Sequence, residues 1–267
     1  MIARTKKRLL QIGNILAVII TILINTLAVI LPLNGNTTQE LSDNLPNLFV
    51  PAGITFSIWS IIYILWFIFA IYQARDLFKK EEINMPFLQQ ISILFIVSSI
   101  ANSTWIFLWH YEYVGLSLLV MIILLFSLLA IYNRLNIGRS IGSMAERLWV
   151  HVPFSVYLGW ITVATIANIT AFLVSVNWDG FGISELNWTI IIIAVATFLT
   201  ILMLALRKDI AFSLVVLWAF FGIWMKRTTL PNTTIDINVA TTITIAIIFI
   251  AIGLLAIIGY QLIRKNT

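Results

Sequence analysis

The sequence contains no cysteine, only two histidines and few charged residues. Without cysteine there can be no disulfide and no thiolate chemistry, and two histidines are too few for a clustered His/Cys metal site. Charged residues make up 10% of the chain and hydrophobic residues 61%, a composition that excludes an ordinary soluble domain. We therefore expect a membrane protein with no bound metal and no cofactor.

Acidic and basic residues are also missing from the middle of every apolar run. Proton-coupled or ion-coupled transport normally leaves an ionisable residue inside the membrane, so a pump or ion-driven transporter is disfavoured. His110 and His151 lie at the ends of apolar runs, and His151 beside Glu146 fits an interfacial pair better than a general base. We expect no catalytic residue and a non-enzymatic protein.

Long apolar runs make up most of the chain. About 20 residues are needed to cross a bilayer core of about 30 Å at 1.5 Å per residue. Most runs reach that length, whereas the seventh has only about 16 residues and is predicted to be a thin but complete span. The sequence thus predicts an all-α, polytopic membrane helix bundle. The runs are 9–33, 52–74, 87–109, 114–133, 148–175, 188–206, 210–225 and 239–263.

Positive charge gathers in alternate connections between these runs. With the N-terminus inside, only Lys226 and Arg227 of the 16 Lys and Arg lie outside, which predicts a multi-pass protein of a bacterium-like inner membrane with a cytoplasmic N-terminus. A re-entrant seventh run would reverse the last run and give the same count, so charge leaves the last two helices open. The net charge of +5 needs no nucleic-acid partner.

The longest outer connection, residues 34–50, mixes turn-forming residues with four apolar ones, Leu41, Leu45, Leu48 and Phe49. A solvated linker would not need these side chains. Two arrangements remain open: a lid that folds over the bundle, and a loop that rests on the bilayer interface.

The run that follows this loop, Pro51 to Arg75, carries aromatic residues at spacings of three and four: Phe56, Trp59, Tyr63 and Phe67, with the hydroxyl of Ser60 among them. Residues at these spacings share one face of a helix. Such a face can be helix-packing surface or an interfacial belt. It can also form the wall of a ligand site.

Polar residues in four runs lie at one depth. Asn25, Trp59, Asn102 and Asn168 each lie about 10–12 Å from the outer end of their run. An asparagine in hydrocarbon needs partners for its carbonyl and its amide, so these side chains should face protein, water or a ligand. The asparagines could also only pin helices together, at about 0.6 kcal/mol each. The neighbouring rings favour a pocket for a flat, mostly apolar molecule.

These residues resemble the motifs of the tryptophan-rich sensory protein family, also called the TspO or translocator-protein family. The likeness covers residues 9–178. In the fifth run, Trp160, Ala164, Thr165 and Asn168 match its Trp-x-x-x-Ala-Thr-x-x-Asn motif; in the third, Asn102, Trp105 and Trp109 match Asn-x-x-Trp-x-x-x-aromatic; in the second, Pro51, Gly53, Phe56, Trp59 and Tyr63 resemble its helix entry.

The resemblance implies a five-helix core, residues 9–178, with a ligand pocket under the loop between the first two helices. The remaining runs, residues 187–264, lie outside the resemblance and are predicted to form an extension of about three helices. It also implies a receptor, sensor or carrier that binds a porphyrin-like or sterol-like molecule and is surrounded by membrane lipid. A homodimer is one assembly that remains open. Together with the depth argument, it predicts a ligand site made of Asn25, Phe56, Trp59, Tyr63, Asn102, Trp105, Trp160, Ala164 and Asn168.

Two other functions remain as alternatives. One is a small-solute permease that uses all eight helices, and the other is a structural membrane partner without a ligand. A permease should continue the polar layer into the last three helices, which carry few polar residues beyond Thr189, Thr197, Thr200, Ser213 and the threonines of the last run.

The charge count predicts which end of the bundle faces the cytoplasm. Because the native chain has no cysteine, a single introduced thiol can be labelled without background. In intact cells Lys80→Cys should resist membrane-impermeant thiol reagents and Asn36→Cys should react. Labelling in the opposite sense would overturn the predicted orientation.

Overall fold

The computed structural model describes residues 4–31, 33–140, 142–229 and 233–266, and helices account for 82% of the chain with no strand among these residues. Seven helical segments are long and apolar enough to cross a membrane, and an eighth apolar helix, Leu94–His110, is shorter. The predicted all-α, polytopic membrane bundle is confirmed.

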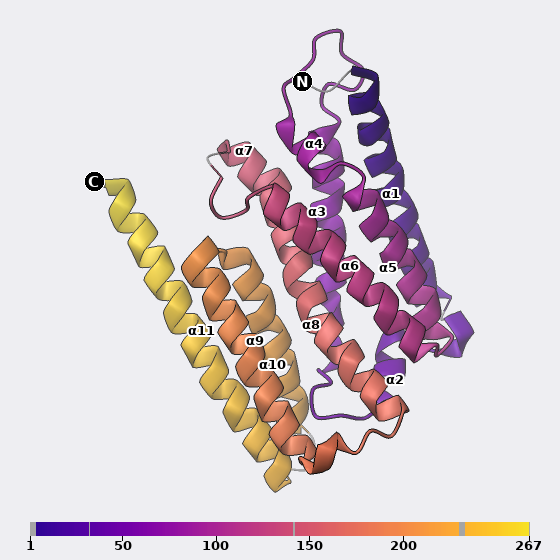
Figure 1. The fold of residues 1–267 in the computed structure, drawn as a ribbon, viewed down its shortest axis with the longest axis vertical. Helices are drawn as coiled ribbons and strands as arrows, with labels where there is room; N and C mark the ends of the chain where they lie inside the picture. Colours follow the sequence, from indigo (N-terminus) through magenta and orange to yellow (C-terminus); the bar gives the residue numbers. More distant parts are fainter. Residues whose placement is uncertain (1–3, 32, 141, 230–232, 267) are drawn as a thin grey trace.

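The eight long helices correspond to the eight apolar runs. The start of α1 and the end of α11 lie toward the same end of the bundle, at the top of Figure 1, as an even number of crossings requires. The long helices are α1 (Arg4–Ile30), α3 (Ile58–Gln73), α5 (Leu94–His110), α6 (Val114–Arg134), α8 (Val152–Ser175), α9 (Glu185–Arg207), α10 (Ile210–Thr229) and α11 (Thr234–Asn266).

Short helical segments make most of the connections. They are η1 (Leu33–Gly35), α2 (Thr38–Asp43), η2 (Gly53–Ser57), α4 (Pro86–Ile91), α7 (Met144–Glu146), η3 (Arg147–His151) and η4 (Gly180–Gly182). Between α9 and α10 only Lys208 and Asp209 intervene. Lys208 adopts a left-handed conformation with φ 53°, and the Asp209 carboxylate accepts a hydrogen bond from the Phe212 N–H at 3.1 Å, so one residue ends α9 and the next caps α10.

The short seventh run forms a longer helix than its apolar length indicates. α10 continues through Lys226 and Arg227 to Thr229, and its 20 residues make it one of the seven candidate spans. Each of the two cations has a carboxylate partner, Asp43 for Lys226 and Asp236 for Arg227. The helix therefore extends beyond the apolar run because these charges are paired.

The third run is not one helix, contrary to the prediction of a continuous segment over 87–109. α4 ends at Ile91, Ser92 adopts φ 51°, and α5 begins at Leu94. The Ser92 N–H still bonds to the Leu88 carbonyl at 2.9 Å. Phe87, Leu88 and Ile91 are fully buried, so burial of this apolar turn offsets the unfavourable serine conformation.

The aromatic face of the second run is split in the structure. Phe56, Trp59 and Tyr63 are partly buried, whereas Ser60 and Phe67 are exposed on the outside of the bundle. The chain is a 3-10 helix from Gly53 to Ser57, with fewer residues per turn than the α-helix that follows. Phe56 lies in this 3-10 segment and the other residues of the face lie in α3, so one α-helical wheel does not describe all of them.

α8 lies at the centre of the fold and packs against α3, α6 and α10 (Figure 1). A π-helical turn precedes it, next to Pro153, which has no N–H to donate to the Trp149 carbonyl. Gly159 lets α10 approach closely, since a Cβ there would lie 3.1 Å from the Phe212 carbonyl oxygen. α8 thus connects the first part of the chain to the last three helices.

A second close approach joins α10 to η2. The Ala52 N–H bonds to the Gly222 carbonyl and the Trp218 indole N–H to the Thr55 carbonyl, at 2.9 and 3.0 Å. A Cβ on Gly222 would lie 1.8 Å from Thr55 Oγ1, so this position accepts no side chain. The absence of a side chain at Gly222 therefore makes room for the Thr55 side chain and lets the two segments bond directly.

A buried polar cluster fastens α1 to the end of α3 near the start of the chain. The Lys7 ammonium donates to the Asp76 carboxylate and to the Ile83 carbonyl, and Gln11 and Gln73 bond to each other's backbone. Burial would raise the pKa of Asp76, but hydrogen bonds from Lys7, the Ile83 N–H and Gln11, with the charge of Lys7, hold it below the usual value.

Removing the Asp76 charge should therefore destabilise the fold. Asp76→Asn leaves the buried Lys7 ammonium without its counter-charge, and we expect a loss of about 3 kcal/mol in unfolding free energy, measured in detergent micelles. Because the pKa of Asp76 is lowered in the folded state, the advantage of the native protein over the variant should be complete above about pH 4 and disappear as the pH falls below it.

The matched control is Glu82→Gln, which removes the exposed Arg4–Glu82 pair at 3.2 Å. An exposed pair contributes at most about 1 kcal/mol, so this variant should stay close to the native protein. Equal losses in the two variants would contradict the assignment of the stability to the buried cluster.

Candidate functional site

A small cavity lies at the end of the bundle opposite the start of α1, with a volume of about 50 Å³. Its wall comes from α3, α5, α8, α10 and the connection between α1 and α3. The lining is mostly aromatic and aliphatic. The lining residues are Thr38, Ser42, Phe49, Pro51, Phe56, Trp59, Trp105, Trp109, Trp160, Val163, Ala164, Ala167, Asn168, Ala219 and Ile223.

Trp59 stands at the centre of the aromatic wall. Its ring lies 6.3 Å from Trp105 in a nearly parallel arrangement and 6.2 Å from Trp160, edge to face, both measured between ring centroids. Phe56 meets Trp160 edge to face at 6.2 Å, and Trp109 stacks on Trp105 at 5.9 Å. Offset and edge-to-face pairs hold large rings in fixed positions, so the wall is preformed.

Asn168 is satisfied within the protein. Its carbonyl oxygen accepts the indole N–H of Trp105 at 3.1 Å and the hydroxyl of Ser117 at 3.4 Å, and its amide donates to the Ala164 carbonyl at 3.0 Å. The side chain therefore orients Trp105 and contributes little free hydrogen-bonding capacity to the cavity.

Trp160 differs from the other rings of the wall. Its side chain is 4% exposed, and its indole Nε1 is buried without a hydrogen-bond partner. A buried N–H without a partner costs about 1–3 kcal/mol relative to one that is bonded. An acceptor atom of a bound molecule would recover this energy, so the Trp160 N–H is available for a hydrogen bond to a ligand.

The connection between α1 and α3 packs onto the bundle as a lid, defined here as residues 37–50. Leu41 and Phe49 are buried. A capping box at the start of α2 fixes the local shape: the Thr37 hydroxyl accepts the Glu40 N–H at 3.2 Å, and the Glu40 carboxylate accepts the Thr37 N–H at 2.7 Å. The Trp109 indole N–H reaches the Thr38 carbonyl at 3.3 Å.

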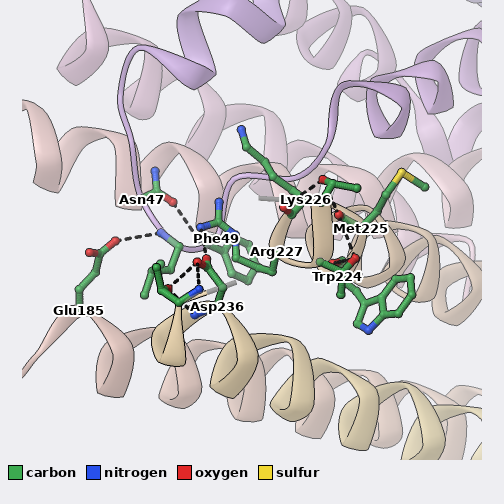
Figure 2. Close-up of polar contacts among 12 residues, drawn as sticks. Asn47, Phe49, Glu185, Trp224, Met225, Lys226, Arg227 and Asp236 are labelled. Atoms are coloured by element: carbon green, nitrogen blue, oxygen red, sulfur yellow. Dashed lines mark hydrogen bonds and ion pairs between the residues drawn. The ribbon is translucent and has the colours of Figure 1, made fainter. Parts of the chain in front are cut away.

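Helices α9 and α10 also hold the lid. The Leu48 N–H donates to the Glu185 carboxylate at 2.9 Å, and Lys226 pairs with Asp43. Figure 2 shows Glu185 of α9 beside the lid segment near Asn47, and Arg227 of α10 paired to Asp236 of α11. Both Arg227 and Asp236 are buried, so this second pair anchors α10 to α11 under the lid.

α10 supplies part of the wall itself, through Ala219 and Ile223. The motif resemblance ends at residue 178 and carries no sign of these two residues. Val163 and Ala167 were also not predicted, although they lie one turn from Trp160 and Ala164 and continue the same helical stripe. Helical spacing could have found the second pair, whereas only the fold brings α10 to the cavity.

Six of the nine predicted site residues line the cavity: Phe56, Trp59, Trp105, Trp160, Ala164 and Asn168. The other three lie elsewhere. The Asn25 amide donates to Asn102 at 2.8 Å, and the Asn102 amide donates to the Tyr157 hydroxyl at 3.2 Å, which joins α1, α5 and α8 away from the cavity. Tyr63 stacks between Trp59 and Trp66.

The chemistry of the cavity is that of a binding site. Its lining contains no ionisable side chain, and the described part of the chain holds no group of three or more His, Asp or Glu residues that could bind a metal ion. The available interactions are stacking, apolar contact and a few hydrogen bonds, among them one to the buried indole N–H of Trp160. These suit a flat, largely apolar molecule.

A family model described as TSPO-like protein matches residues 11–260, a range that includes α9, α10 and most of α11. No curated protein and no solved structure matches the chain. The family and the helix bundle together support the class of membrane sensors and carriers. The match covers far more than half of the chain and confirms the resemblance carried by the motifs; the chain belongs to the TSPO-like protein family.

Proposed function

We propose that this protein is a non-enzymatic membrane receptor or carrier that binds a flat hydrophobic metabolite, of porphyrin or sterol type, in the cavity beneath the lid. The observation that carries this proposal is the aromatic wall formed by Trp59, Trp105 and Trp160, with the unpartnered indole N–H of Trp160 in it. The rings would stack on the faces of the ligand, and the N–H would bond to a carbonyl or carboxylate at its edge.

The size of the cavity makes the lid part of the mechanism. At about 50 Å³ the cavity is far smaller than the roughly 300–1,000 Å³ of a typical small-molecule site. Thr38, Ser42 and Phe49 of the lid all line it, so displacement of the lid enlarges the site without disturbing the helices. Binding would therefore couple to opening of the lid, and hence to the contacts that Glu185 and Lys226 make with it.

The alternative of a permease receives less support. The hydroxyls of Thr189, Thr197 and Thr200 donate to carbonyls of their own helix, and Ser213 bonds to the Asp209 carbonyl. Hydroxyls bonded in this way offer no polar path for a solute through α9 and α10. A structural partner without a ligand would not require the unpartnered Trp160 N–H.

A direct ligand screen tests the proposal. The purified protein is titrated with a tetrapyrrole, a sterol and a quinone, and binding is followed by quenching of tryptophan fluorescence. We expect saturable quenching by at least one of these flat molecules, since four tryptophans line the cavity. No saturable binding by any of them would refute the proposed ligand class.

The wall predicts the effect of removing one ring. Trp160→Ala should weaken binding at least about fivefold, because a stacked ring contributes about 1 kcal/mol beyond its buried area. Binding is read from the absorbance of the ligand, since the variant has lost a tryptophan. Trp160→Phe keeps a ring and removes the N–H, so a loss in this variant as well would show that the N–H bonds to the ligand.

Trp188→Ala is the control for loss of a tryptophan. The Trp188 ring lies 5.2 Å from Trp178, and its N–H bonds to the Gly180 carbonyl at 2.9 Å, outside the cavity. This variant should bind as the native protein does. If folded Trp160→Ala and Trp188→Ala proteins bound with equal affinity, Trp160 would not belong to the site.

The lid contacts predict a change in binding rate. Lys226→Ala removes the partner of Asp43 and should raise the association rate of the ligand by up to about fivefold, the equivalent of a pair worth at most about 1 kcal/mol. Stopped-flow measurements at low ionic strength check this. High salt should raise the native rate toward that of the variant and leave the variant nearly unchanged.

The double variant Asp43→Ala/Lys226→Ala provides the control. If the ion pair holds the lid, the second substitution should add almost nothing to the first, because the contact is already lost. Additive effects on the rate would mean that the two residues act separately, and the lid mechanism would then be wrong.

A further inference from the structure

A second hollow lies at the opposite end of the bundle, and it shares no residue with the cavity under the lid. This cleft of about 910 Å³ is bounded by the segment after α6, the first turns of α8, the turn between α9 and α10, and the last part of α11. In Figure 1 these elements meet toward the upper end, between α7 and the tops of α9, α10 and α11.

Three cations surround the cleft: Arg139, Arg147 and Lys208. Arg139 donates to the Leu206 carbonyl at 3.2 Å, Arg147 to the Ser140 carbonyl at 3.5 Å, and the Lys208 ammonium lies 4.4 Å from the centre of the Tyr260 ring. Across the residues with described positions, none of the three has a carboxylate oxygen within 4.0 Å. Their charges are oriented but not neutralised.

Two acidic residues lie nearby and do not neutralise this rim. The Asp209 carboxylate is buried and accepts hydrogen bonds from the Tyr132 and Ser155 hydroxyls and from the Phe212 N–H. These neutral donors stabilise its negative charge and do not cancel it. The Glu146 carboxylate lies 3.8 Å from His151 Nε2. Because the three cations outnumber these two carboxylates, the cleft keeps a net positive rim.

His151 adds a buried polar group to the wall. The side chain is 6% exposed, lines the cleft, and its Nε2 has no hydrogen-bond partner. An imidazole nitrogen that carries a proton can donate to a phosphate oxygen. This is a second sign of a ligand, independent of the cationic rim, because buried polar groups in folded proteins are rarely left unpaired.

The remaining wall is apolar. Met144, Val152, Ile210 and Leu214 line the cleft, and Met144 and Leu214 are more than half exposed. A soluble anion would not use this surface. An amphiphile with an anionic head and hydrocarbon next to it would contact both the cations and these side chains.

We propose that this cleft binds the headgroup of an acidic membrane phospholipid. The phosphate would accept hydrogen bonds from Arg139, Arg147 and His151, with Lys208 as a fourth cationic or polar contact, and the glycerol and first acyl carbons would lie on the apolar wall. A zwitterionic headgroup is disfavoured because its ammonium would meet three cations, while the Asp209 carboxylate is buried.

Native mass spectrometry of the full chain in an uncharged detergent tests the site. Such a micelle has no surface potential, so bound lipid reports discrete binding. Phosphatidylglycerol should bind at least about tenfold more tightly than phosphatidylcholine of the same chain length, and Arg139→Gln/Arg147→Gln should reduce this affinity about tenfold or more. Lys208→Gln should reduce it less, since one charge is removed instead of two.

Lys79→Gln/Lys80→Gln is the charge-matched control, because both lysines are exposed at the same end of the bundle and do not line the cleft. This variant should bind phosphatidylglycerol as the native protein does. Equal loss in both double variants, or no loss in the arginine variant, would overturn the proposal. Glycerol 3-phosphate serves as a soluble competitor: if it displaced the lipid at equal concentration, the site would recognise a free phosphate and the lipid assignment would be wrong.

Discussion

Polar groups inside a membrane protein cannot turn to water, and the whole bundle is arranged around that constraint. The Asn25 amide reaches Asn102, Asn102 reaches Tyr157, and Trp105 reaches Asn168, so helices α1, α5 and α8 can adopt only the rotations that close these bonds. These hydrogen bonds satisfy the buried polar side chains between α1, α5 and α8 and so allow the three helices to pack together. Among the described residues, several buried polar atoms lack a partner, and the Trp160 indole N–H is the one of them that belongs to the lining of the cavity.

The same constraint explains why some of the predicted site residues join helices whereas others line the cavity. Asparagine can serve as an interhelical fastener or as a ligand contact, and the two uses look identical in sequence. Asn25 and Asn102 form hydrogen bonds between helices, while Asn168 fixes the orientation of Trp105 in the cavity wall. The wall is thus mainly aromatic, with its polar groups mostly used to hold the rings in position.

The sequence was sufficient for the membrane class, the number of long helices and the buried stripes. Asn14, Val18, Thr21 and Asn25 recur at spacings of three and four, which places them on one helix face, and all four are buried on α1. It was not sufficient for the break at Ser92, because a serine between apolar residues gives no local signal of a positive φ. Nor could it place Ala219 and Ile223 in the wall, since that contact depends on how α10 packs against α8 and η2. The division into a core over 9–178 and an extension over 187–264 stays a prediction.

The contact between α10 and η2 has a consequence for how the protein is made. Ala52 bonds directly to the Gly222 carbonyl, and Gly222 has no room for a side chain beside Thr55. A ribosome delivers η2 and α8 to the membrane before α10. Until α10 has been synthesised, the cavity lacks the part of its wall formed by Ala219 and Ile223, and the Ala52 N–H lacks its partner. The cavity is therefore complete only after more than four fifths of the chain has been made.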